Sequence, residues 1–380
     1  KQLGQYLTPI EMVQFMVETA IESLSTKEFE TLISPEKCKE FGYILDSSCG
    51  VGSFLIEIVK QLSVIVKKKH GEEKYNTWIS NMSEHVIFGI DKSERMIKLA
   101  IANLTLAGIE SPNIHSLNSL SKSQNSDVLI KQLEGQVGLI LTNPPFGAEF
   151  KGHDLEDYKI ANEWCGKVQS KIDSEVLFVE RYIDWLKDGG HCITVVPDSI
   201  LFNKSIYQEL RRSISQYIYV NSVVSFPSKT FAVAGTSAKT SVLHFIKGNI
   251  KGKHKTFFAV CNDLGFDIST QSTHKVRVQS GKNELPLILN SFKSLGGFKN
   301  SGWRDFSADS HRWDAIYHSL LSNDLEKRIL HPKEDDVCLT DVAEIINERI
   351  NPTKNIGFFR YIEISDINSH SSTIQSKEVE

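Results

Sequence analysis

The stretch YILDSSCGVGSFL, residues 43–55, decides the fold. It begins with a short apolar strand that ends at Asp46, continues through a polar turn that contains Gly50 and Gly52, and leads into the apolar segment 54–69, which has helical periodicity. Glycine permits positive φ and lets a ligand approach the backbone. This order is typical of a doubly wound sheet, in which ligands bind beyond the carboxyl ends of the strands.

Strand-like and helix-like segments alternate on both sides of this stretch. Further strands are predicted at 85–91, 137–142 and 191–197, and helices at 8–24, 93–108 and 174–190. The alternation predicts an α/β fold with a mostly parallel sheet and helices on both faces. The pattern changes from about residue 203, where a helix at 207–217 precedes two strands, at 218–227 and 240–248, that can form an antiparallel hairpin.

Composition and charge narrow the function classes. The 380 residues, 40% hydrophobic and 24% charged, suit a soluble globular protein with room for two domains. The net charge of -4 means that a nucleic-acid surface must be a local basic patch. The six cysteines show no C-x-x-C spacing, so we expect free thiols and no metal site. Because we find no signal peptide and no run of 18 apolar residues, we expect a cytoplasmic protein without a membrane partner.

The second predicted strand adds a candidate for cofactor binding. It ends at Asp91, and an acidic residue there can accept hydrogen bonds from both hydroxyls of a ribose. The alternative is that Asp91 or Ser93 caps the next helix, and the two roles can coexist. The residues after Gly52 fit neither G-x-G-x-x-G nor a G-K-[ST] phosphate loop. These signals favour an adenosine-containing ligand without a long phosphate chain, such as S-adenosylmethionine, although a tight turn without a ligand would also explain the glycines.

The segment LILTNPPFGAEF, residues 139–150, ends a buried strand with Asn143, Pro144, Pro145 and Phe146. The Asn143 side-chain oxygen and the rigid Pro144 carbonyl can accept the two hydrogens of an adenine amino group. The nitrogen lone pair then points out of the ring plane and can attack a methyl group without a strong general base. Phe146 can stack on the base, an interaction worth roughly 1–3 kcal/mol. The alternative is a Pro-Pro turn with Phe146 in the core.

These motifs, DSSCGVGSFL, GID and NPPF, preceded by GQYLTP at residues 4–9, resemble those of the DNA adenine-N6 methyltransferases of type I restriction-modification systems and their single-chain relatives. The similarity spans about residues 1–250. It implies a class I S-adenosylmethionine-dependent methyltransferase fold, with a seven-stranded sheet and a late antiparallel hairpin. It also implies methylation of adenine N6 in a base flipped out of double-stranded DNA, with specificity and restriction subunits as partners.

The resemblance also implies roles for individual residues. The cofactor-binding residues would be Thr8, Pro9, Asp46, Cys49, Gly50, Gly52, Asp91 and Asn118. The residues that hold the target base would be Asn143, Pro144, Pro145 and Phe146. Phe231 is a candidate for the second face of the flipped base, with packing under the late hairpin as the alternative.

The chain departs from the family pattern at two positions. Ser47 stands where the family usually has proline in the first turn, a loss that should be tolerated. Asn118 stands where the family usually has an Asp that accepts a hydrogen bond from the adenine amino group of the cofactor. A neutral amide oxygen should bind more weakly, by about 1 kcal/mol.

Two longer segments are associated with the substrate. The segment 147–174 can close over the base, with a mobile surface loop as the alternative. Residues 337–368 resemble the opening of a target-recognition domain, with an extension that packs on the catalytic domain as the alternative. We therefore predict a methyltransferase domain at 1–305, a linker or helical segment at 306–330 and a truncated recognition-type domain at 331–380.

Two other functions remain compatible with the sequence. Methyltransferases that act on RNA adenine or on protein glutamine use the same chemistry, but those relatives tend to carry Tyr at the position of Phe146 and to lack the GQYLTP segment. An inactive DNA-binding scaffold is the third possibility, and Asn118 is its only sign.

Overall fold

The computed structural model describes residues 7–122, 128–166, 168–234, 238–248, 252–271, 274–294, 301–307 and 310–320, and four short strands after residue 358. Contacts divide the chain into two units, Lys1–Glu326 and Lys327–Glu380. Most of the predicted recognition-type domain, and the GQY part of the leading motif, lie outside the described residues. The predicted domain boundaries therefore stay predictions.

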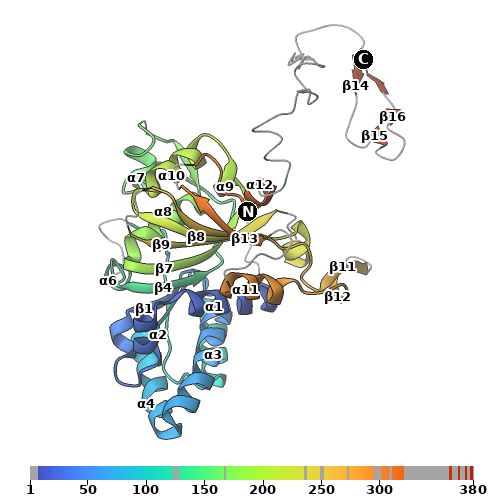
Figure 1. The fold of residues 1–380 in the computed structure, drawn as a ribbon. Helices are drawn as coiled ribbons and strands as arrows, with labels where there is room; N and C mark the ends of the chain where they lie inside the picture. The colour runs from blue at the N-terminus through green and yellow to red at the C-terminus, as the bar shows by residue number, and fades with distance from the viewer. Residues whose placement is uncertain are drawn as a thin grey trace. The chain divides into compact units, whose positions relative to one another are not determined.

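A nine-stranded sheet forms the centre of the first unit (Figure 1). Its strands are β1 (Tyr43–Asp46), β2 (Ile87–Asp91), β3 (Asn113–Ser116), β4 (Val137–Thr142), β7 (Leu186–Pro197), β8 (Ile218–Ser225), β9 (Thr240–Lys247), β10 (His254–Val260) and β13 (Ser301–Phe306). The order across the sheet is β13-β10-β8-β9-β7-β4-β1-β2-β3. Strand β9 is antiparallel to β7 and β8, β13 is antiparallel to β10, and the other pairs are parallel.

The seven strands from β8 to β3 confirm the predicted doubly wound sheet with its late antiparallel hairpin. Strands β10 and β13 extend this sheet beyond β8 and were not predicted. Residues 174–190 were predicted as one helix, but the helix ends at Trp185. Leu186 is already extended and fully buried, and it pairs with Val137 of β4, so sheet pairing overrides the helical pattern.

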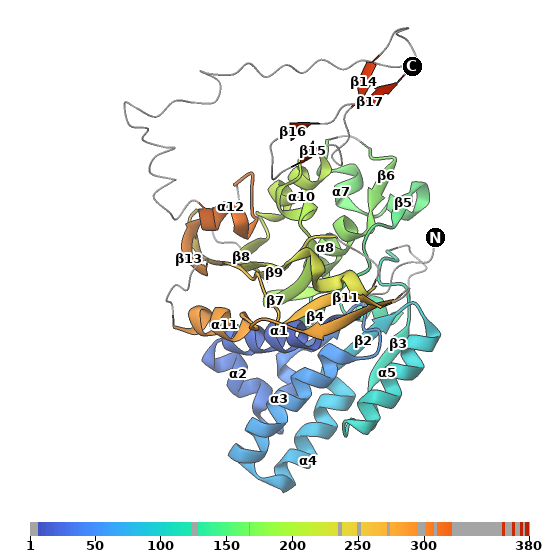
Figure 2. The same ribbon diagram turned by 90° about the vertical axis from the view of Figure 1, so that its right-hand side faces the viewer.

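Helices cover both faces of the sheet (Figure 2). On one face lie α1 (Ile10–Ser23), α2 (Thr26–Ile33), α3 (Ser53–His70), α4 (Glu72–Asn81), α5 (Glu94–Leu106) and α11 (Leu285–Lys293). On the other lie α6 (Val128–Gln132), α7 (Lys159–Asn162), α8 (Ser174–Trp185), α9 (Ser199–Phe202), α10 (Ile206–Ile214) and α12 (Ala315–Leu320). Adjacent strand residues point to opposite faces, so Ile44 packs in the first core and Leu45 in the second.

Residues 148–166 and 168–173, called the insertion below, form a folded element between β4 and α8. Its ends pair as a hairpin of β5 (Glu149–Lys151) and β6 (Lys171–Asp173), and it contains α7 and the 3₁₀ turn η3 (Gly152–Leu155). Leu155, Tyr158 and Ile160 are buried in the second core. The insertion is therefore packed onto the domain.

The remaining elements are short. They are the turns η1 (Cys38–Phe41), η2 (Met82–Val86) and η4 (Ser228–Ala234), and a hairpin of β11 (Phe266–Gln271) and β12 (His274–Gln279). In the second unit, β14 (Phe359–Tyr361) pairs with β17 (Lys377–Val379), and β15 (Ile367–Asn368) pairs with β16 (Thr373–Ile374). No helix in the described part of the chain combines the length and the hydropathy that a membrane span needs.

Candidate functional site

A cavity of about 420 Å³ lies at the carboxyl ends of the central strands. Its walls come from the segments that follow β1, β2, β3 and β4, from the insertion and from the first turns of α8. This is the edge at which doubly wound folds bind ligands. The predicted residues that line it are Gly50, Asp91, Asn118, Asn143, Pro144 and Pro145.

The glycine turn after β1 contributes one open backbone position. Gly50 has φ 51°, and no atom lies within 4 Å of the place where a Cβ would stand. Gly52 has φ 87°, a conformation that favours glycine, and a Cβ there would make only an ordinary contact at 3.5 Å from Leu104 of α5. Cys49 is buried in the first core, and burial raises the pKa of its thiol well above the usual value. Of these three predicted residues, only Gly50 lines the cavity.

Asp91 connects the end of β2 to the glycine turn. Its Oδ2 accepts a hydrogen bond from Gly50 N at 3.0 Å, and its Oδ1 accepts one from Ser93 N at 2.8 Å. The side chain therefore fixes the turn that leads into α5, and it also lines the cavity. The predicted cap is not formed, because Ser93 is the N-cap residue of α5 and makes no side-chain capping hydrogen bond. The contact with ribose hydroxyls predicted for Asp91 stays a prediction.

Asp46 does not line the cavity but ties the end of β1 to the end of β4. It is only 1% exposed, and its Oδ1 accepts hydrogen bonds from Thr142 Oγ1 at 2.8 Å and from Ser48 N at 3.1 Å. Burial raises the pKa of Asp46 to about 7, although the Thr142 hydroxyl favours the ionised form. This placement makes Asp46 a support of the site and gives no direct sign of contact with a ligand.

The NPPF turn, residues 143–146, contains a residue that lines the cavity and carries a buried acceptor without a partner among the described residues. Asn143 Nδ2 donates to Thr8 Oγ1 at 3.0 Å, which fixes the orientation of the amide. Asn143 Oδ1 is buried, yet it has no hydrogen-bond partner among the described residues. A buried polar atom without a partner costs free energy, so such an atom marks a place where a ligand can bind.

Two predicted aromatic residues lie away from the cavity lining. Phe146 is half-buried and packs against the first core. Phe231, in η4, is 2% exposed and is part of that core. The placement of Phe231 supports its alternative role, packing under the late hairpin. Base stacking by either ring stays a prediction.

The leading segment meets the site through Thr8 and its neighbours. Leu7 lines the cavity, and Thr8 holds Asn143 through the hydrogen bond described above. Pro9 precedes α1, and its carbonyl accepts from Met12 N and Val13 N at 3.0 Å. Pro9 is therefore the N-cap residue of α1, one position before the first-turn site that proline favours.

The start of α8 holds the NPPF turn, and sequence reasoning missed it. Ser174 Oγ donates to the Pro145 carbonyl at 3.0 Å, and Glu175 Oε2 accepts from Gly147 N at 3.0 Å. Ser174 N also donates to the Ala148 carbonyl at 2.8 Å, which closes the base of the insertion. Burial raises the pKa of Glu175, which is 6% exposed. The only sequence signal was a polar Ser-Glu pair at a helix start.

The Asn118 loop, residues 117–122, forms the wall beyond β3. Leu117, Asn118, Ser119 and Leu120 line the cavity. Ser119 Oγ donates to the Ser47 carbonyl at 2.7 Å, which attaches the loop to the glycine turn. Asn118 Oδ1 accepts a hydrogen bond from Leu120 N at 3.3 Å. The oxygen that was expected to accept from the cofactor therefore already has one partner within its own loop.

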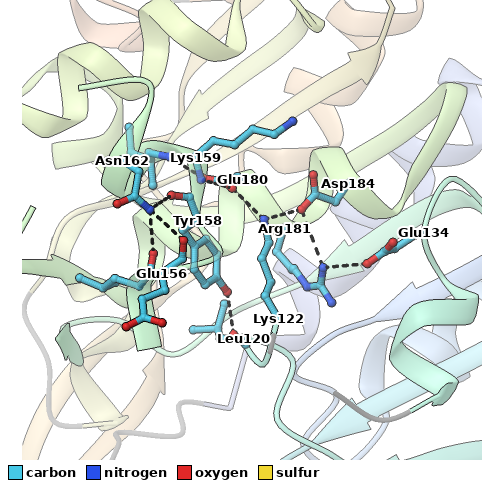
Figure 3. A network of polar contacts seen from close by, with 12 residues as sticks. Leu120, Lys122, Glu134, Glu156, Tyr158, Lys159, Asn162, Glu180, Arg181 and Asp184 are labelled. Atoms are coloured by element: carbon cyan, nitrogen blue, oxygen red, sulfur yellow. Dashed lines mark hydrogen bonds and ion pairs between the residues drawn. The ribbon is translucent and has the colours of Figure 1, made fainter. Parts of the chain in front are cut away.

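A buried polar network supports this loop from outside the cavity (Figure 3). Lys122 Nζ lies 2.7 Å from Glu180 Oε1 and 2.6 Å from Asp184 Oδ2. Glu180 also accepts from Lys159 N and Ile160 N of the insertion, each at 2.9 Å. The network therefore joins α8, the insertion and the Asn118 loop.

Comparison with known proteins extends these observations. Residues 1–284 match the family described as N-6 DNA Methylase. The chain is 26% identical over 364 residues to the type I restriction enzyme EcoEI methylase subunit of Escherichia coli, covering 94% of this chain and 64% of that protein. It is 22% identical over 360 residues to the MpnII methylase subunit of Mycoplasma pneumoniae, covering 92% of this chain and 58% of that protein. The chain thus spans about three fifths of the length of these two relatives.

Solved structures support the same fold. The methyltransferase subunit of a type I restriction-modification system from Streptococcus thermophilus superposes with a TM-score of 0.55 at 19% identity, covering 81% of this chain and 57% of that chain. The type I restriction enzyme EcoKI M protein superposes with a TM-score of 0.55 at 16% identity, covering 87% of this chain and 74% of that chain. At these identities the similarity concerns the fold alone.

Proposed function

The chain belongs to the N-6 DNA methylase family, and we propose that it is the catalytic part of a site-specific DNA methyltransferase. The reaction we assign to it moves a methyl group from S-adenosylmethionine to N6 of an adenine in double-stranded DNA, within a restriction-modification system. The single observation that carries this proposal is the buried Oδ1 of Asn143, which has no partner among the described residues and belongs to a residue that lines the cavity.

The geometry of Asn143 suits an amino group as its ligand. One hydrogen of its Nδ2 is donated to Thr8, whereas Oδ1 has no partner among the described residues, and an amide oxygen can only accept. An adenine amino group donates two hydrogens. Asn143 Oδ1 would accept one and the Pro144 carbonyl the other, which leaves the nitrogen lone pair out of the ring plane.

The cavity residues fit the proposed cofactor. Gly50 leaves backbone open to a ligand, Asp91 can accept from ribose hydroxyls, and the apolar side chains of Met96 and Leu117 can contact an adenine ring. Ser48 Oγ, next to Gly50 on the lining, is a second buried polar atom without a partner among the described residues. S-adenosylmethionine, when bound, supplies an electrophilic methyl group on a sulfonium sulfur.

The roles of the chain's own residues follow from these contacts. Asn143 and Pro144 orient the amino nitrogen, and Thr8, Ser174 and Glu175 hold the turn that carries them. The methylated nitrogen is cationic and releases one of its protons to water. This step needs no general base because a protonated arylamine is strongly acidic.

The DNA substrate and its partners are part of the proposal. An adenine amino group is reached only when the base leaves the stack, so contacts to DNA must offset the cost of flipping, a few kcal/mol. The two relatives described above are named methylase subunits of type I restriction enzymes, which supports specificity and restriction subunits as partners. Sequence recognition would come from the chain beyond residue 330 or from such a subunit.

A competition assay tests the proposed substrate class. The longest available form of the chain is incubated with methyl-labelled S-adenosylmethionine and unmethylated duplex DNA, with RNA or bulk protein as competitor. We expect label in DNA adenine that is insensitive to either competitor. Transfer of label to RNA or protein instead would overturn the proposal in favour of the corresponding methyltransferase, and cofactor binding without transfer to any acceptor would favour the scaffold.

A further inference from the structure

The Asn118 loop is held by two buried side chains that bind three successive carbonyls. Arg181 Nε donates to the Ser119 carbonyl at 3.3 Å, and Arg181 Nη2 donates to the Ser121 carbonyl at 3.4 Å. Between them, Tyr158 Oη donates to the Leu120 carbonyl at 2.8 Å. Arg181 comes from α8 and Tyr158 from the insertion, so two elements fix one loop (Figure 3).

Both side chains are buried, and Arg181 Nη1 also lies 3.4 Å from Glu134 Oε1 and 3.8 Å from Asp184 Oδ2. Tyr158 is 1% exposed and Arg181 is 2% exposed. Burial raises the pKa of the Tyr158 hydroxyl, so it stays protonated and can donate. The Lys122 ammonium lies 4.5 Å from the centre of the Tyr158 ring and 2.7 Å from Glu180, which fixes the end of the same loop.

The loop held in this way is a wall of the cavity. Ser119 and Leu120, whose carbonyls accept these hydrogen bonds, line the cavity, as does Asn118. A loop that must order itself on binding loses affinity, whereas one that is already fixed does not. The hydrogen bonds from Tyr158 and Arg181 therefore act on ligand binding through the loop.

We propose that Tyr158 and Arg181 are positioning residues for the cofactor, which hold the Asn118 loop in the geometry that receives the adenosine part. The insertion thereby contributes to cofactor affinity as well as to the surroundings of the target base. This inference rests on the proposed function, because it takes the ligand of the cavity to be S-adenosylmethionine.

The test compares two Tyr-to-Phe substitutions by calorimetric titration of the full chain with S-adenosylmethionine. Tyr158→Phe removes the hydroxyl that binds Leu120. The matched control, Tyr207→Phe, removes a hydroxyl that donates to Asp173 Oδ2 at 2.7 Å, at the end of the insertion and outside the Asn118 loop. We expect Tyr158→Phe to raise the Kd about three- to tenfold, the net worth of one hydrogen bond, and Tyr207→Phe to change it less than about twofold.

The Kd for S-adenosylmethionine distinguishes a positioning role of Tyr158 and Arg181 from a role in the stability of the fold alone. Titrations are run at a temperature where both variants are fully folded by circular dichroism, so a purely structural role would leave the Kd unchanged. Arg181→Lys keeps the charge and loses the planar fork, and we expect it to raise the Kd as well. If the wild-type chain binds the cofactor, and both variants bind it with the same Kd as the wild type, the inference is wrong and the proposed function is unaffected. If the wild-type chain binds no cofactor, both this inference and the proposed function are wrong.

Discussion

Substitution of Thr142 by valine should destabilise the protein more at high pH than at low pH. Thr142 Oγ1 donates to Asp46 Oδ1 at 2.8 Å, and both side chains are at most 1% exposed. A hydrogen bond to a charged group is worth about 1.5–3 kcal/mol, against about 0.5–1.5 kcal/mol between neutral groups. Thr142→Val should therefore lower the free energy of unfolding by the larger amount where Asp46 is ionised and by the smaller amount where it is protonated.

The direction of this pH dependence follows from the pKa of Asp46. Burial raises this pKa from 3.8 to about 7, so the folded state binds the proton more tightly and wild-type stability falls as pH rises between these values. Loss of the Thr142 donor raises the folded pKa further, by about one unit for each 1.4 kcal/mol. The free energy of unfolding of the variant should therefore keep falling above pH 7. In the wild type, the contribution of Asp46 protonation no longer changes in that range.

Urea unfolding near pH 5 and near pH 8.5 measures the effect. The matched control is Thr256→Val, because Thr256 is fully buried and its Oγ1 donates to the neutral carbonyl of Val220 at 2.6 Å. The cost of the control substitution should be the same at both pH values. An equal cost of Thr142→Val at both pH values, or a larger cost at low pH, would refute the placement of an ionisable Asp46 under the turn.

Two further substitutions test other parts of the site and fold. Glu175→Ala removes the acceptor of Gly147 N, a hydrogen bond worth about 0.5–1.5 kcal/mol. This change should lower kcat for methyl transfer more than it lowers cofactor affinity. Steady-state kinetics check this, and an unchanged kcat would contradict it. Burial lowers the pKa of His191 from 6.5 to about 4, and that of His244, 3.1 Å away, also falls. The folded state therefore loses stability as pH falls from 6.5 towards 4, and His191→Gln should reduce that loss in acid unfolding curves; a loss as steep as in the wild type would contradict the neutral pair.

The central part of the fold could be predicted because its signals are local. The strand before Asp46, the glycine turn and the periodic helix after it need only neighbouring residues to be read. The same is true of Asp91 and Asn143, each directly at or after a strand end. Parallel strands place their carboxyl ends at one edge, so these residues come together without knowledge of any long-range contact.

The rest depends on contacts between distant residues. Nothing in the local sequence shows that Glu175 binds Gly147, or that Tyr158 reaches Leu120. Cys49 matched the motif position, yet its side chain belongs to the core, because the direction of a side chain in a turn is set by the fold. Strand β10 pairs with β8 and β13 pairs with β10, and both pairings join segments that are distant in the sequence.

The most direct test of the central claim is methyl transfer by an Asn143→Ala variant. The longest form of the chain, with labelled S-adenosylmethionine and unmethylated genomic DNA, is compared with this variant and with Asn76→Ala, an exposed position on α4. We predict label on adenine N6 at one recurring sequence for the wild type and for Asn76→Ala. For Asn143→Ala we predict loss of label with cofactor binding retained. Label that persists in Asn143→Ala would contradict the role assigned to the unpaired oxygen.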